Sequence, residues 1–159
     1  MKSAISSFVF LSAILVFVGS AQARSDEAGI TQCTGSKNQT VETTPQVSFA
    51  IGEAYGTVRA SPESSIFDMM TSHCLGASRV VDGKPFVWGH CEWTDKDGDK
   101  VLLEYARSQG LSGKYTVVYG TGKFSGITGT RDYRITPFPT VQGGRAVCDE
   151  GTLRYTLPQ

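Results

Sequence analysis

The segment from Trp88 to Arg107 constrains the fold of this chain most, because it alternates apolar and polar residues on both sides of the turn-forming cluster Asp95–Asp99. A two-residue turn would set polar side chains opposite apolar ones. A three-residue loop with Gly98 in the left-handed conformation sets like opposite like: Trp93 opposite Val101, Cys91 opposite Leu103, and Gly89 opposite Tyr105. Because a one-residue slip turns every side chain over, burial selects the second register. The segment therefore predicts an antiparallel hairpin with one apolar face.

The chain beyond residue 45 has the same character throughout. Short runs rich in Val, Ile, Tyr, Phe and Thr are separated by clusters of Gly, Pro and Asp, which is typical of an antiparallel sandwich or barrel. These runs predict about seven strands, near residues 47–60, 66–80, 86–94, 100–108, 113–120, 131–136 and 145–157. Residues 63–70 also fit a short helical turn. We expect one all-β domain over residues 46–159.

The predicted strand at 113–120 extends the apolar face of the hairpin. Side chains alternate along a strand, so Tyr115, Val117 and Tyr119 are expected on one face. Aromatic side chains supply large contact areas, and their polar tips can orient a ligand. The candidate ligand-binding residues are Trp93 and Tyr105 of the hairpin with Tyr115 and Tyr119 of this strand.

The first 23 residues have the pattern of a cleavable signal peptide. Lys2 precedes an apolar run from Phe8 to Val18, and Ala21-Gln22-Ala23 is a small-residue cleavage site. We therefore expect a periplasmic or secreted protein, with no membrane partner once the signal is removed. Residues 24–45 are polar and end at Pro45, and we expect an N-terminal arm with little core of its own.

The charges of the chain argue against a nucleic-acid partner. The sequence has 15 basic and 15 acidic residues, interspersed along its length, whereas a polyanion-binding protein concentrates Lys and Arg on one face. The sequence gives no indication of the oligomeric state.

All four cysteines lie in the part of the chain that would be exported, where thiols are oxidised. Four cysteines allow three connectivities. We predict a Cys74–Cys91 disulfide, because these residues fall on consecutive predicted strands, and a Cys33–Cys148 disulfide near the chain ends. The repeats His73-Cys74 and His90-Cys91 also suggest a zinc site. Adjacent residues of a strand point to opposite faces, however, so we expect no metal.

Two further motifs resemble ligand-binding loops but do not match them fully. Asp95, Asp97 and Asp99 begin like a calcium loop, but the glycine and glutamate required later are Lys100 and Ala106. The glycine-rich run Gly120–Gly129 lacks the spacing of a dinucleotide or phosphate loop. We interpret the first as a hairpin turn and the second as β-turns or bulges with close backbone approach.

Few residues offer acid–base chemistry. The candidates are His73, His90, Glu92, Glu104 and Asp149. The hairpin register places His90 across from Glu104 on the wetter face, where an exposed ion pair is the simpler interpretation. The chain has no Gly-x-Ser-x-Gly elbow and only two histidines. No catalytic residue can be assigned.

Three motifs carry a resemblance to a known group. They are Cys91–Asp99, the glycine-rich run Gly120–Gly129, and the closing segment Leu153–Pro158. Over residues 50–158 the chain resembles the allene oxide cyclase barrel-like proteins, many of them exported bacterial proteins, with dirigent proteins as more distant relatives. The resemblance implies an antiparallel barrel of about eight strands whose lumen holds an apolar ligand. No catalytic position of the cyclases can be matched to a residue of this chain.

Three hypotheses about function follow. The leading one is an exported barrel that binds a small apolar or amphipathic molecule in its lumen and needs no cofactor. The second is a cofactor-free cyclase or isomerase, which requires a buried ionisable residue in the lumen. The third is a structural or protein-binding module that uses its outer face, with Trp88 as an exposed anchor.

Overall fold

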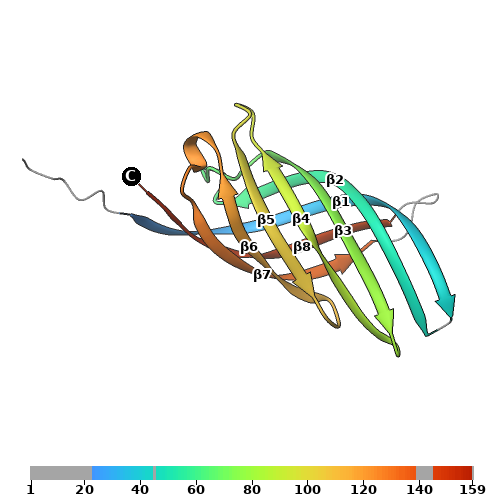
Figure 1. Ribbon diagram of the computed structural model, residues 1–159. Coiled ribbons are helices and arrows are strands. Elements are labelled where there is room, and N and C mark those ends of the chain that lie inside the picture. Colours follow the sequence, from blue (N-terminus) through green and yellow to red (C-terminus); the bar gives the residue numbers. More distant parts are fainter. Residues whose placement is uncertain (1–22, 45, 139–144, 159) are drawn as a thin grey trace, which may run out of the picture.

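The computed structural model describes residues 23–44, 46–138 and 145–158, so residues 1–22 of the expected signal peptide lie outside the described part. Eight strands follow one another along the chain: β1 (Arg24–Thr44), β2 (Val47–Ser61), β3 (Met70–Val81), β4 (Lys84–Thr94), β5 (Lys100–Arg107), β6 (Ser112–Gly120), β7 (Thr128–Pro137) and β8 (Arg145–Leu157). A one-turn 3-10 helix, η1 (Gly122–Phe124), precedes β7. The strands close into a barrel in sequence order, each antiparallel to its neighbours (Figure 1). The expected all-β barrel of about eight strands is confirmed.

The polar segment at residues 24–45 differs from the expected arm, because Arg24–Thr44 is strand β1. It pairs with β2 from Gly29 to Thr44 and with β8 from Arg24 to Ser36, and the second pairing closes the barrel. Its inward side chains alternate with outward ones, and Ala28, Ile30 and Gln32 are buried. The overall composition of the segment is polar. Only every second side chain of the strand faces the core, so composition alone did not reveal the strand.

The β4–β5 hairpin has the predicted register. Trp93 pairs with Val101, Cys91 with Leu103, and Gly89 with Tyr105. Gly98 has a φ of +87°, as the three-residue loop requires. The Asp95 carboxylate accepts hydrogen bonds from the backbone N–H groups of Asp97 and Asp99, each at 2.9 Å. The Asp95 side chain therefore stabilises the turn.

Strand β6 departs from simple alternation after Val117. A bulge shifts the register with β5, so that Leu103 pairs with Val117 but Leu102 pairs with Tyr119. The extra residue turns the end of β6 over, and Tyr119 is 63% exposed on the outside of the barrel. The expectation that Tyr119 shares the inner face of Tyr115 is therefore wrong.

One end of the barrel is filled by side chains. Phe67 from the β2–β3 connection packs against Trp93 and against Phe124 of η1, and these three side chains and Ile127 belong to one buried cluster. The connection forms turns between Ser61 and Met70, so β3 starts later than the expected residue 66. The glycine-rich run allows this packing. A side chain on Gly120 would collide with the backbone of Phe124, so glycine is needed where the two segments meet. We call this the plugged end.

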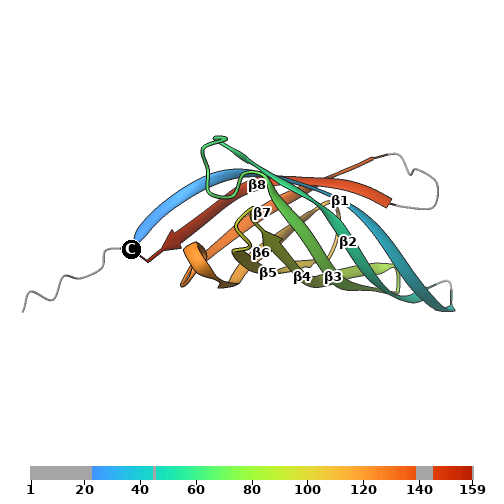
Figure 2. The ribbon, with the colours of Figure 1, turned by 90° about the horizontal axis from the view of Figure 1, so that it is seen from above.

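The barrel has one inner and one outer disulfide, with the predicted pairing. Cys74–Cys91 joins β3 to β4 inside the barrel, and Cys33–Cys148 joins β1 to β8. Figure 2 shows β1 and β8 along one side of the barrel and β3 to β5 along the other. The neighbours of the inner cysteines, His73 and His90, face outward, so the two His-Cys repeats do not converge on one point.

No helix among the described residues has the length and apolar character needed to cross a bilayer.

Candidate functional site

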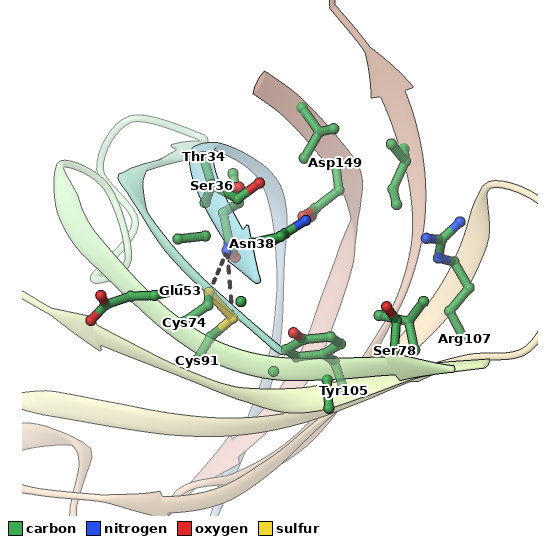
Figure 3. A pocket seen from close by; sticks show the side chains of 18 of the residues that line it. Thr34, Ser36, Asn38, Glu53, Cys74, Ser78, Cys91, Tyr105, Arg107 and Asp149 are labelled. Carbon is green, nitrogen blue, oxygen red and sulfur yellow. Dashed lines mark hydrogen bonds between the residues drawn. A yellow bond between two sulfur atoms is a disulfide. The ribbon is translucent and has the colours of Figure 1, made fainter. Parts of the chain in front are cut away.

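A cavity of about 320 Å³ occupies the lumen at the end opposite the plug. Its walls come from inward-facing residues of all eight strands, among them Thr34, Ala54, Ser78, Val87, Tyr105, Tyr115, Tyr133, Val147 and Asp149. Figure 3 shows Tyr105, Arg107 and Asp149 around this space, with the Cys74–Cys91 disulfide in its wall. The volume lies at the lower end of the range for small-molecule sites.

Three tyrosines form the aromatic part of the cavity. Tyr115 lies between Tyr105 and Tyr133, with ring centroids 5.6 Å and 4.7 Å away. Burial raises the pKa of Tyr133 to about 12 and the pKa of Tyr115 well above its ordinary value. The phenols are therefore neutral hydrogen-bonding groups at neutral pH.

A carboxyl group and a guanidinium group lie beside Tyr115. Arg131 donates from Nη2 to the Asp149 Oδ1 atom and, at 3.1 Å, to the Asp149 carbonyl oxygen. The Tyr115 hydroxyl donates to Asp149 Oδ2 at 3.4 Å. Burial raises the pKa of the Asp149 carboxyl above its usual value, although Arg131 acts in the opposite direction. The lumen thus contains a carboxyl group that takes up a proton more readily than an exposed aspartate.

The Arg131 side chain is completely buried beneath the cavity. Its Nε and Nη1 atoms have no hydrogen-bond partner among the described residues. The guanidinium lies 5.1 Å from the ring centroid of Tyr115 and 5.9 Å from that of Trp93. Attraction between the cation and these aromatic faces offsets part of its desolvation.

A hydrogen-bonded network joins the cavity to the plug. Trp93 donates from Nε1 to the side-chain oxygen of Gln32 at 2.9 Å, and Gln32 donates to Ser72 at 3.1 Å and to the Cys74 sulfur at 3.4 Å. Gln32, Trp93 and Ser72 are all buried. Because its buried polar groups are paired, this network holds the base of the cavity in one arrangement.

The structure brings together only part of the predicted ligand-binding set. Tyr105 and Tyr115 line the cavity. Trp93 faces inward but lies in the plugged end below it, and Tyr119 lies on the outer surface. Alternation along the strands correctly placed Tyr105, Tyr115 and Trp93 inside the barrel. It failed for Tyr119, because the bulge in β6 has no clear signal in the sequence.

Residues at the base of the site that were not predicted as ligand contacts include Tyr133, Arg131 and Asp149. Tyr133 and Arg131 stand two residues apart on β7, so alternation could have found them together. A buried arginine contradicts the usual preference of that residue for the surface. Asp149 was among the acid–base candidates, but nothing in the sequence placed it in the lumen.

The other acid–base candidates lie outside the barrel. His90 Nε2 is 3.4 Å from Glu104 Oε1, and both side chains are more than half exposed. His73 Nε2 lies 2.8 Å from Glu53 Oε1. These are surface pairs, as expected for His90 and Glu104. Trp88, the expected outer anchor, is half-buried beside Phe86 with ring centroids 5.4 Å apart.

The fold and the site define a closed eight-stranded antiparallel barrel with a small-molecule-sized lumen. Among solved structures the chain is similar to the pterocarpan synthase dirigent protein GePTS1, with a TM-score of 0.53 and 9% identity over 94% of this chain and all of that one. A second dirigent protein, PsPTS1, gives a TM-score of 0.45 and 10% identity over 83% of this chain and 94% of that one. No family model and no curated protein matches. The similarity to GePTS1 establishes the fold alone, a dirigent-like barrel.

Proposed function

We propose that this chain is an exported protein that binds a small amphipathic molecule in the barrel lumen. The supporting observation is the cavity itself, which combines mostly apolar walls with hydroxyl and carboxyl groups at its base. A closed core filled by side chains was the alternative for a barrel of this size. The open volume beside Tyr105, Tyr115 and Tyr133 favours a bound ligand instead.

The distribution of polar groups indicates how the ligand lies. Ala54, Val87 and Val147 offer apolar contact along the walls, whereas Tyr115 and Asp149 are the polar groups at the base. An apolar molecule with one hydroxyl or carbonyl group would bury its hydrocarbon part and direct that group inward. The ligand would be held by apolar burial and oriented by one or two hydrogen bonds.

The experiment compares two tryptophan substitutions with 2-naphthol as the probe. Ser78→Trp fills the cavity near its mouth, and Thr116→Trp adds the same bulk on the exposed face of β6. We expect calorimetry to detect 2-naphthol binding to the natural protein and to Thr116→Trp, with at least tenfold weaker binding to Ser78→Trp. Equal affinity in all three proteins, or no binding to any of them, would contradict the proposal.

A cofactor-free cyclase or isomerase is the second candidate, and one observation favours it. Asp149 is a buried lumen carboxyl with a raised pKa, which could protonate an epoxide or hydroxyl oxygen of a bound molecule. A panel of epoxides and hydroxylated aromatic compounds tests this by chiral chromatography of the products. Asp149→Asn should abolish enantiomeric excess while 2-naphthol still binds, because the apolar walls and the Tyr115 hydroxyl remain. Racemic product from the natural protein with every compound would exclude this candidate.

Export to the periplasm or medium is part of the proposal. It is supported by the two disulfides and by the signal-like sequence of residues 1–23. N-terminal sequencing of the protein from cell fractions should find Arg24 first, in the extracytoplasmic fraction. Cytoplasmic protein that retains Met1 would contradict this part.

A further inference from the structure

At the open end of the barrel, an exposed apolar side chain lies in or next to each of the four strand connections. These residues are Val47 after the β1–β2 connection, Val81 at the β3–β4 turn, Leu111 at the β5–β6 turn and Phe138 after β7, with exposed fractions of 36% to 50%. Phe49, close to Val47 on the outer face of β2, is 45% exposed. Figure 1 shows the first three of these connections at the same end of the barrel. Apolar groups therefore surround the cavity mouth.

Basic side chains accompany this apolar rim. Arg79 and Lys84 flank the β3–β4 turn, and Arg107 ends β5 at the cavity mouth, where Figure 3 shows it. Asp82 is the acid in the same turn. A groove of about 470 Å³ runs between the β3–β4 and β5–β6 connections and contains Arg79, Lys84, Phe86 and Gln109. The rim is therefore both apolar and cationic.

The plugged end has the opposite charge character. Its connections carry five acids: Glu63, Asp68, Asp95, Asp97 and Asp99. The basic groups near them are held in ion pairs, Arg59 with Asp68, Lys96 with Asp97, and Lys123 with Asp95. Met69 is 68% exposed at this end. Exposed apolar groups occur at both ends, but among the residues that the structure describes the open end alone combines them with an excess of basic groups.

We propose that the open end of the barrel docks on anionic lipid bilayers, with the side chains of Val47, Val81, Leu111 and Phe138 entering the interface and Arg79 and Lys84 contacting headgroup phosphates. Apolar side chains that enter the headgroup region and basic groups that meet anionic lipid together produce peripheral membrane binding. The sequence alone led us to expect no membrane partner. That expectation rested on the lack of a spanning segment, whereas surface docking depends on where the connections lie in space.

A bilayer fits this surface better than a second copy of the chain. Two open ends facing one another would bring like charges together, with Arg79, Lys84 and Arg107 on both sides. The apolar residues also stand on separate connections around an opening rather than on one continuous face. A bilayer accepts such separated side chains individually, and a ligand of the proposed kind could then pass from the lipid into the lumen.

Sedimentation with vesicles tests the docking. We expect the protein without residues 1–23 to bind vesicles that contain phosphatidylglycerol, and to bind weakly to pure phosphatidylcholine. Each basic group near an anionic surface contributes about fivefold to binding, so R79Q with K84Q should weaken binding about thirtyfold. Added salt should weaken it as well, because exposed charges are screened. Val81→Ser with Leu111→Ser should reduce binding without altering the charge.

Matched controls lie at the plugged end. Lys96→Gln and Met69→Ser alter exposed groups of the same kinds there, and should leave vesicle binding unchanged. Ser78→Trp should also retain it, which separates docking from the proposed lumen ligand. Equal binding to both vesicle types, or equal losses at both ends, would overturn the proposal. Light scattering that showed dimers broken by the open-end substitutions would assign the surface to a second copy instead.

Discussion

The two disulfides should contribute unequally to stability, because they close loops of very different length. Cys33 and Cys148 are 115 residues apart, whereas Cys74 and Cys91 are 17 apart. In the chain-entropy treatment these loops correspond to about 5 and about 3 kcal/mol, a difference of about 1.7 kcal/mol. The larger contribution belongs to the bond at the β1–β8 pairing that closes the barrel.

Two double variants isolate the bonds. C74A/C91A retains only the outer disulfide, and C33A/C148A retains only the inner one. Urea unfolding of each variant, oxidised and then reduced, measures the bond within one packing background. We expect reduction to cost C74A/C91A about 5 kcal/mol and C33A/C148A about 3 kcal/mol. An inner bond that contributes as much as the outer one would refute the entropic argument.

Three further predictions concern single residues. Gly83→Ala should cost about 1 kcal/mol from its φ of +71° alone, and Gly122→Ala more, because its Cβ would also displace the Asp99 carboxylate. Equal urea midpoints would contradict this. Tyr115→Ala should cost about 3 to 5 kcal/mol and Tyr119→Ala less than about 1, in the same assay, because only the first side chain is buried. Burial raises the folded-state pKa of Asp149 above its unfolded value, so the natural protein should lose stability relative to Asp149→Asn as the pH rises from acid to neutral. A relative gain over that range would show that the pKa is lowered instead.

The sequence by itself determined the features that depend on short-range chemistry. Side chains alternate with a period of two, and the Asp95–Asp99 turn has one loop length that keeps the hairpin face apolar, so the β4–β5 register followed. Both disulfide pairs could be predicted as well, because an oxidising compartment favours pairing and Cys74 and Cys91 lie on consecutive strands. The hairpin register and the Cys74–Cys91 pair follow from residues that are close in sequence, and Cys33–Cys148 follows as the remaining pair.

Only the tertiary structure decided what barrel closure brings together. Strand β1 is composed largely of polar residues, and its place in the barrel depends on β8, more than a hundred residues later. The bulge that turns Tyr119 outward and the pairing of Arg131 with Asp149 likewise depend on neighbouring strands. Which end is plugged follows from how the β2–β3 and β6–β7 connections pack. Pairing β1 with β8 costs chain entropy, and burying Arg131 with Asp149 costs desolvation free energy. These contacts form only in the closed barrel, where the packing of all eight strands offsets both costs.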